Sequence, residues 1–508
     1  MNRMFKTAML TAGCAIMAAG AAMASEGTIN IAYTAIPDAL IQTKHVPEIP
    51  AGIVYSQTTE TLIAKNKDGE LEGRLAETWE VSDDAKEYTF HLRDTLKWSD
   101  GEPVTADDVV YTFNMLKEAA GFGVVGSVVD TTEKIDDYTV KITLNKPNVV
   151  FLSNIAIPMY AAIQPAHGVE KFGDDYGTSV ETTLSCGAYT LTEWVPDVSI
   201  TMVANPEYYR GEPAIETIVY HEMLDTNATV VALQTGELDL SYSAISGTAY
   251  TTLAADPNIT IEEFSSGRNE SIYMYCKDGI FSDVRMRQAV AYAINAEEAL
   301  MVAADGLGTV VRYPGDIGEL MSGNPTDYEV NIDYTQDIEK AKALVAECGM
   351  EGAEVVVKSY NTEPYATIGV WLQAVLQNIG LNATCQPEER SQFLDELMKE
   401  ELTIFPLAWV GQAYDMDEVL GGLVYSANAG SPNNEYYINE DMDALVDASR
   451  AETDAEARKE IFKQIIDKYL EDMPFVPLYN VTTAFPHTSK IVTDYPKTYQ
   501  IFDYKWAE

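Results

Sequence analysis

Strands that alternate with amphipathic helices over residues 271–480 constrain the fold of this chain more than any other feature. Residues 354–360 have the composition of a strand, and Pro364 then begins a helix that Gly380 ends. The apolar face of that helix consists of Ile368, Leu372, Val375, Leu376 and Ile379. Because strands and helices that alternate in this way pack as layers, the segment predicts an α/β lobe.

The residues before this segment are richer in strands, with a helix expected over residues 55–62. Alternating apolar and polar residues predict strands over residues 28–34, 138–144, 185–194, 199–203 and 215–220. A chain of 508 residues is too long for one simple core, and its 46% hydrophobic content is enough for several. We therefore expect two or three domains.

Residues 71–116 combine a strand, a turn and a capped helix. Every second side chain of residues 87–93 is apolar, the pattern of a half-buried strand. Asp100 and Gly101 form a turn, and Thr105 then stands at a helix N-cap with two aspartates in the first turn. The stretch contains no nucleophile, base or metal cluster, so it is predicted to be scaffold.

Polar residues that accept hydrogen bonds from backbone N–H groups mark helix starts in the second half. Ser282 is expected to cap a helix that runs to residue 293. Asn295 with Glu298, and Thr453 with Glu456, have the spacing of capping boxes.

The net charge is −46, from 33 basic and 79 acidic residues. This balance argues against nucleic acid and anionic membrane surfaces as partners. We interpret it as a solubilising acidic surface rather than as an acidic pocket, because net charge does not locate a pocket.

Residues 1–24 have the pattern of a secretory signal, with a short basic start and an apolar run. Small alanines stand at the two positions that signal peptidase recognises, so cleavage is predicted before Ser25. Lipidation at Cys14 is the alternative, but Thr11 stands where a lipobox has an aliphatic residue. No later stretch approaches the roughly 18 apolar residues of a membrane span. We expect an exported protein that is soluble after cleavage.

Four cysteines follow the signal: Cys186, Cys276, Cys348 and Cys385. Their spacing contains no metal-type pair, and an exported protein can form disulfides. Cys348 and Cys385 end a predicted helix and a predicted strand of the same unit, so they are the expected disulfide. Four free thiols are the alternative.

The chain lacks the sequence motifs of common enzymes. It contains no Gly-x-Ser-x-Gly elbow, no His-Glu-x-x-His and no phosphate-binding Gly-x-x-x-x-Gly-Lys. The histidines are scattered at His45, His91, His167, His221 and His487. We expect no catalytic residue and no cofactor, while binding of a metal complex stays open.

Six segments in order resemble the family 5 solute-binding proteins of ABC transporters, the peptide and nickel group. They are residues 71–116, 205–211, 233–240, 281–295, 339–349 and 474–479. The match extends over essentially the whole chain after the signal. One departure is residues 185–189, Ser-Cys-Gly-Ala-Tyr, where the family has Gly-Thr-Gly-Pro-Tyr.

The resemblance implies a two-lobed α/β fold of the Venus-flytrap type, type II-like, with an extra subdomain in the first lobe. Lobe I is expected to be discontinuous, over residues 25–55, 177–272 and 481–508. The extra subdomain would take residues 56–176 and lobe II residues 273–480. Such a protein captures a small solute between its lobes and delivers it to an ABC permease and its ATPase, as a monomer and without chemistry of its own.

The resemblance places a ligand-binding loop at residues 405–417 of lobe II. Peptide binders of the family have Trp-x-Gly-Asp here, and the Asp pairs with the peptide ammonium. This chain has Trp409, Val410, Gly411 and Gln412, so a neutral amide replaces the acid. Because charge-assisted hydrogen bonds are about twice as strong as neutral ones, recognition of a peptide N-terminus is weakened. Asp415 stands at another acidic position of the family loop, where a structural, turn-forming role is expected and ligand binding is the alternative.

Further ligand contacts are expected where strands end at the cleft. Tyr33 and Ala35 follow the first strand, where the family has ligand-facing groups. Tyr360 and Asn361 end a lobe II strand, which in an open α/β sheet faces the crevice. Tyr479 stands at the final crossing between the lobes. Packing or hinge roles are the alternatives for each.

A peptide or peptide-like solute is the expected ligand. A receptor for a sugar, an opine or a metal chelate is the alternative within this class. A secreted hydrolase with a dispersed site is the alternative from another class.

Overall fold

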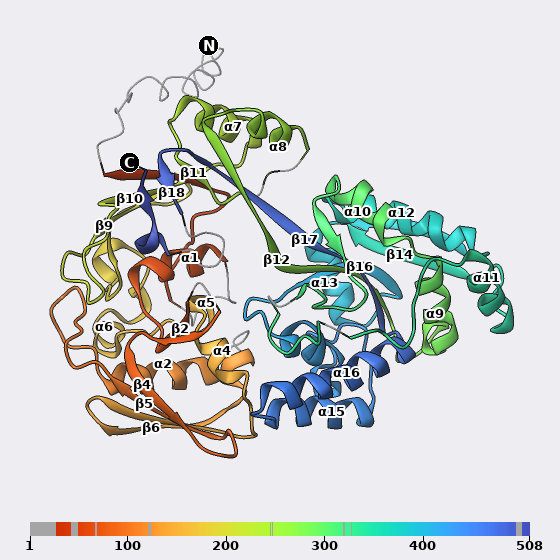
Figure 1. Ribbon diagram of the computed structural model, residues 1–508, viewed down its shortest axis with the longest axis horizontal. Coiled ribbons are helices and arrows are strands. Elements are labelled where there is room, and N and C mark those ends of the chain that lie inside the picture. Colours follow the sequence, from red (N-terminus) through yellow and green to blue (C-terminus); the bar gives the residue numbers. More distant parts are fainter. Residues whose placement is uncertain are drawn as a thin grey trace, which may run out of the picture.

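The computed structural model describes residues 27–41, 49–66, 69–119, 123–243, 245, 247–318, 321–326, 328–493 and 500–507. The predicted signal at residues 1–24, its cleavage site and Cys14 lie outside these residues. Figure 1 shows two bodies joined by two long strands, β12 (Ile259–Met274) and β17 (Phe475–Thr488). The fold is therefore the two-lobed α/β fold that the sequence predicted.

A single sheet runs through both lobes. In the described residues it has eleven strands. Ten follow one another in the order β15 (Asn382–Glu388), β14 (Glu354–Tyr360), β16 (Ile404–Val410), β12, β17, β11 (Leu240–Ser241), β1 (Thr28–Tyr33), β10 (Thr217–Glu222), β9 (Ser199–Ala204) and β8 (Tyr189–Val195). The eleventh, β13 (Gly308–Val310), pairs with β17.

The antiparallel ladder of β12 and β17 is irregular between the lobes. Its register shifts between Ser265 and Asn269, and Gly267 inside this interval has a φ of +68°. A Cβ atom at Gly267 would lie 2.4 Å from the carbonyl oxygen of Gly411, so a larger residue cannot fit. Such an irregularity bends a strand locally, and this one lies beside the loop that follows β16.

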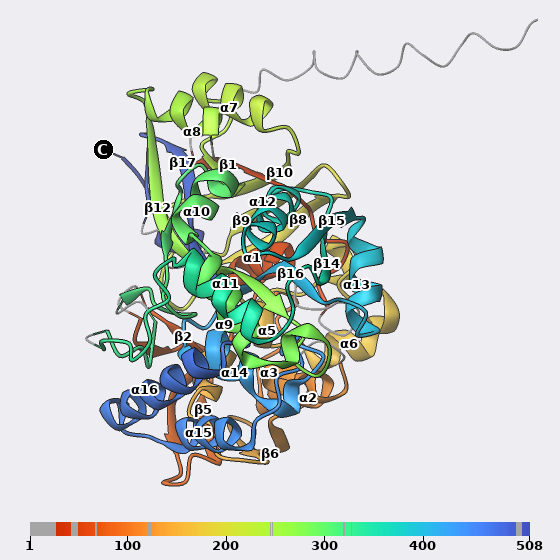
Figure 2. The ribbon, with the colours of Figure 1, turned by 90° about the vertical axis from the view of Figure 1, so that its right-hand side faces the viewer.

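Lobe I packs β1, β8, β9 and β10 around a core that the C-terminal residues complete. Ile31, Ile218, Phe485 and Tyr504 belong to this core. The helices are α1 (Ile49–Thr58), α7 (Thr226–Thr235) and α8 (Gly247–Ala254). Figure 2 shows α7 and α8 at the end of the molecule opposite α15 and α16.

The helix expected over residues 55–62 is wrong in position, because α1 ends at Thr58. The next four residues connect it to β2 (Ile63–Lys65), which pairs with β3 (Leu71–Gly73).

A separate core forms beside lobe I, from residues between Leu62 and Cys186. Its four-stranded sheet has the order β4 (Ala76–Val81), β5 (Glu87–Leu92), β7 (Thr139–Leu144) and β6 (Val129–Asp136). The helices are α2 (Ala106–Glu118), α3 (Gly123–Gly126), α4 (Phe151–Ile155), α5 (Pro158–Ala161) and α6 (Ala166–Phe172).

The capped helix predicted near residue 105 is α2. Thr105 and Asp108 form a reciprocal capping box. Asp108 also accepts hydrogen bonds from Trp98 Nε1 (3.2 Å) and from the backbone N–H of Ala166 (2.8 Å). One buried carboxylate thus ties the turn, the helix and a distant loop together.

Lobe II has the alternation of strands and helices that the sequence predicted. Its helices are α9 (Val284–Ala293), α10 (Ala296–Ala304), α11 (Ile338–Glu347), α12 (Tyr365–Asn378), α13 (Arg390–Met398), α14 (Gly422–Val424), α15 (Glu440–Ala451) and α16 (Ala455–Asp472). Asn295 caps α10 as predicted. Two other caps were placed one residue early: Asp283 caps α9 and Asp454 caps α16.

The predicted disulfide does not form in the structure. The four described cysteines are free. Cys348 follows α11, and its thiol lies 3.7 Å from the Asp283 carboxylate at the start of α9. Cys385 lies on β15 and faces Gly369 of α12. The two thiols therefore pack against different helices, which is the reason the prediction from their shared unit is wrong.

Candidate functional site

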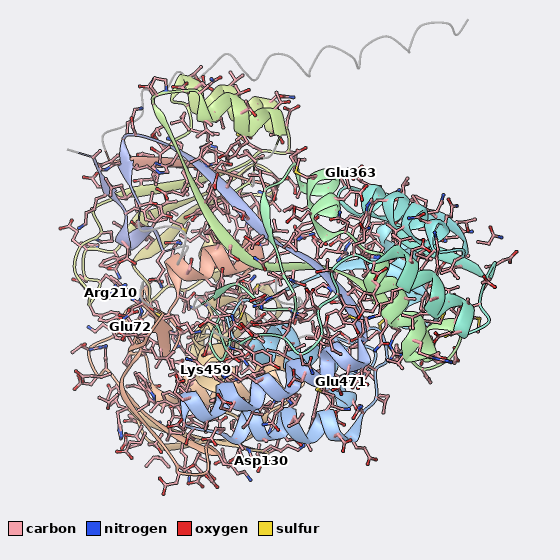
Figure 3. All side chains as sticks on the ribbon, turned by 45° about the vertical axis from the view of Figure 1, so that its right-hand side comes forward. Glu72, Asp130, Arg210, Glu363, Lys459 and Glu471 are labelled. Carbon is pink, nitrogen blue, oxygen red and sulfur yellow. The ribbon has the colours of Figure 1, made fainter. Side chains whose placement is uncertain are left out.

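A cavity of about 200 Å³ lies between the lobes, next to the irregular part of the β12–β17 ladder. Lobe I and its extra core line it from α1, from β2 and from residues 156–159 before and at the start of α5. The crossing strands contribute Phe264, Ser266, Thr483 and Phe485. The loop after β16 contributes Gln412 and Tyr414. Side chains from both bodies surround the crossing strands (Figure 3).

Contacts beside the cavity join the two lobes directly. Lys65 Nζ donates to the carbonyl oxygen of Ala413, and the Tyr160 hydroxyl donates to Glu418 Oε1 at 3.2 Å. Further away, the backbone N–H of Val149 donates to the carbonyl of Arg450 at 2.9 Å. The lobes are therefore in contact around the cavity.

The loop at residues 411–415 is held from both of its ends. The N–H of Gly411 donates to the carbonyl of Gly267 at 3.0 Å, and the N–H of Ala413 donates to Glu418 Oε2 at 2.6 Å. Asp415 forms a bidentate ion pair with Arg458 of α16, with distances of 2.7 and 2.8 Å. This support leaves the side chain of Gln412 directed at the cavity on a fixed backbone.

Two carboxylates support this loop in opposite charge environments. Burial alone would raise the pKa of Asp415, but the Arg458 guanidinium outweighs it, so the pKa lies below its ordinary value. Burial raises the pKa of Glu418 to about 7, against hydrogen bonds from Ala413 and Tyr160 that lower it. Glu418 lies in a short π-helical turn, Asp417–Gly421, a distortion that is frequent at functional sites.

Lys65 is the charged side chain among the described residues that line the cavity. Burial lowers the pKa of its ammonium group, and Asp415 and Glu418 nearby partly offset this. The cavity lining thus presents a partly desolvated cation, and the two carboxylates nearby form no ion pair with it.

Gln412 is the predicted ligand-binding residue that lines this cavity. Tyr33 ends β1 and Ala35 follows it, and neither belongs to the cavity lining. Tyr360 is buried and packs edge-on against Tyr365 and Phe393.

Asn361, which follows β14, donates its amide to Glu389 at 2.7 Å. Val410 pairs with Arg268 inside the sheet, and Trp409 packs against the lobe II core. Gly411 and Asp415 shape the loop without lining the cavity. Tyr479 is fully buried on β17.

The sequence did not single out Lys65, Met159, Phe264 or Phe485, which line the cavity. Lys65 and its partner Ala413 are separated by 348 positions. No local pattern brings such residues together, so only the three-dimensional fold identifies them.

The described residues contain no group of three or more His, Cys, Asp or Glu placed to hold a metal ion. Within the same part of the chain, no helix has both the length and the apolar content needed to cross a bilayer.

The fold and the cavity between the lobes define a two-lobed binding protein. A family model described as bacterial extracellular solute-binding proteins, family 5, matches residues 70–431. The chain belongs to this family of solute-binding proteins.

Relatives match over most of their length. Di/tripeptide-binding protein 4 of Pseudomonas aeruginosa is 27% identical, covering 92% of this chain and 92% of that protein. Heme-binding protein A of Haemophilus influenzae is 27% identical, covering 86% and 83%. Dipeptide-binding protein of Escherichia coli is 28% identical, covering 77% of each.

Solved structures share the fold. HbpA2 from Haemophilus parasuis superposes with a TM-score of 0.81 at 23% identity, covering 95% of this chain and 100% of that one. The periplasmic binding protein DppA from Helicobacter pylori, in complex with the peptide STSA, gives a TM-score of 0.79 at 21% identity, with 95% and 98% covered.

Proposed function

We propose that this protein is the receptor of an ABC importer, which captures a small peptide-like solute between its lobes and delivers it to the membrane permease and its ATPase. The observation that carries this proposal is the cavity at the junction of the lobes, lined by residues of both and by the two crossing strands. Family membership and the di/tripeptide-binding relative support it.

Binding uses closure of the lobes about the irregular segment of β12 and β17. The contacts of Lys65 with Ala413 and of Tyr160 with Glu418 form only when the lobes meet. A ligand that bridges the lobes favours this closed arrangement, because it contacts both walls only there. The receptor acts as a monomer, carries out no chemistry and works outside the cytoplasm after its signal is removed before Ser25.

A thermal-shift screen with separate pools of short peptides, oligosaccharides and metal chelates tests the proposal. Binding at a hundredfold excess over Kd stabilises a protein by about 2.7 kcal/mol, which raises Tm measurably. We expect a rise in Tm with a peptide-like pool, and recovery of the bound compound unchanged by mass spectrometry. Conversion of the compound with time would instead support the alternative that the protein is a hydrolase. If no pool raises Tm, the proposed receptor function is wrong.

A further inference from the structure

We infer that the cavity selects a solute that carries a carboxylate and no free ammonium group, such as an N-acylated peptide or amino acid, with Lys65 as the residue that meets the carboxylate. This inference rests on the proposed receptor function and names its ligand class.

The first observation is the charge of the cavity. Acidic residues outnumber basic ones in this chain by 79 to 33, so an average lining would contain more carboxylates than cations. The described residues that line the cavity include one cation, Lys65, and no carboxylate. The charge of the lining residues is thus opposite to the charge of the whole protein, which favours an anionic ligand group in the site.

The second observation is the unfilled hydrogen-bonding capacity of Lys65. An ammonium group has three N–H donors, and one of them binds the carbonyl oxygen of Ala413. The nearby carboxylates are engaged elsewhere: Asp415 binds Arg458, while Glu418 accepts from Ala413 and Tyr160. A ligand carboxylate would therefore supply the charged partner that Lys65 lacks in the described residues.

The third observation concerns the uncharged polar groups of the lining. Within the described residues, the Gln412 amide and the Thr483 hydroxyl make no side-chain hydrogen bond. Both can donate to a carboxylate or to an amide carbonyl. Met159, Phe264 and Phe485 provide apolar surface beside them. This combination suits a blocked peptide or an acylated amino acid.

A free ammonium group would be unfavourable in the same place. It would find no carboxylate among the described lining residues, and it would share a desolvated site with Lys65. Like charges in such a site repel each other strongly, so the cavity discriminates against amines as well as for carboxylates.

The test compares two dipeptide pools with the full mature protein. One pool is N-acetylated and keeps its free carboxylates; the other is C-amidated and keeps its free ammonium groups. We expect the acetylated pool to raise Tm and the amidated pool to leave it unchanged. For the strongest acetylated binder, calorimetry should show a Kd at least about tenfold higher in Lys65→Met, as expected from loss of a charge-assisted hydrogen bond.

Lys141→Met is the matched control, because it removes the same charge from β7, where Lys141 pairs with Glu87 outside the cavity. Its Kd should equal that of the wild type. If Lys65→Met does not fold, the second variant to test is Gln412→Asp, which changes a half-buried loop residue. The added carboxylate should weaken the acetylated binder and admit the amidated pool.

The outcomes separate this inference from the receptor function. Equal Kd values for Lys65→Met and Lys141→Met, or tighter binding of the amidated pool, would overturn the role of Lys65 while the receptor function stands. Binding of oligosaccharides or chelates alone would do the same. Absence of binding from every pool would overturn the receptor function itself.

Discussion

Asp415 and Glu418 are three residues apart on one turn of lobe II, yet their surroundings shift the pKa values of the two carboxyl groups in opposite directions. Asp415 is 2% exposed and accepts hydrogen bonds from both terminal guanidinium nitrogens of Arg458. Glu418 is 8% exposed and accepts hydrogen bonds from backbone N–H groups and from the Tyr160 hydroxyl, without an ion pair to any described residue. Arg458, which also belongs to lobe II, neutralises the charge of Asp415. Glu418 instead accepts a hydrogen bond from Tyr160 of the opposite lobe.

The difference separates a fixed part of the site from an adjustable part. The Asp415–Arg458 pair anchors the loop at residues 411–415 to α16 whether or not the lobes meet, because both residues belong to lobe II. The Glu418–Tyr160 bond exists only when the lobes are in contact. Substitutions at the two positions should therefore differ in size and in dependence on pH.

The largest effect is expected from Asp415→Asn. The change leaves the Arg458 charge buried without its partner, which costs about 3–5 kcal/mol in comparable cases. Urea denaturation should show this loss as a lower midpoint. The control is Lys459→Met, which breaks the exposed Lys459–Glu456 pair near the start of α16 (Figure 3) and should cost under about 1 kcal/mol. Equal losses would show that the buried pair does not anchor the loop.

A pH-dependent effect of intermediate size is expected from Glu418→Gln. The pKa of Glu418 rises from 4.5 to about 7 on folding, so the folded state holds this proton more tightly than the unfolded state. The resulting stabilisation is complete below pH 4.5 and is lost as the pH rises through 7. At about 1.4 kcal/mol per pKa unit, the loss is roughly 3 kcal/mol.

Urea midpoints at pH 4.5 and pH 8 provide the measurement for Glu418. Between these two pH values, the free energy of unfolding of the wild type should fall by roughly 3 kcal/mol more than that of Glu418→Gln. Other buried carboxyls, such as Glu435, titrate in both proteins and cancel in the comparison. Identical pH dependence of the two proteins would mean that Glu418 does not titrate in this range.

A smaller loss of stability is expected from Asp108→Ala. This change extends the comparison to a carboxylate whose hydrogen-bond donors are all N–H groups. The change removes the acceptor of Thr105, Ala166 and Trp98, and an unsatisfied buried donor costs about 1–3 kcal/mol. We expect a loss of about 2 kcal/mol in thermal unfolding. Asp107→Ala is the neighbouring control, because Asp107 is exposed and pairs with Lys134. A loss no larger than that of the control would rule out Asp108 as a structural cross-link.

Local elements could be predicted from the sequence where a single face is buried. The strand β14 and the cap of α2 follow from short patterns of apolar residues and hydrogen-bonding side chains. The full length of β12 could not be predicted, since its middle, residues 262–270, is largely polar, contains Gly267 and pairs with β17 far along the chain.

The site could be predicted only in part. Gln412 was found because the resemblance placed a loop there, and the structure places it in the cavity lining. Lys65 was missed because a lysine before a turn has the pattern of a solvated side chain, and its environment depends on lobe II. Trp409 was placed in a binding loop, but it lies on the strand β16 and its ring packs on lobe II rather than at the cavity.

The sheet that passes through both lobes has a consequence for the order in which the chain folds during synthesis. The residues of lobe II lie in the sequence between β12 and β17, which are adjacent antiparallel strands and pair Tyr273 with Phe475. The lobe II core therefore comes from one continuous segment of the chain, which can fold on its own. The lobe I core needs Phe485, Ile501 and Tyr504, which follow lobe II in the sequence and are made after it. Lobe II can therefore complete its core first, and the core of lobe I is complete only after these later residues are made.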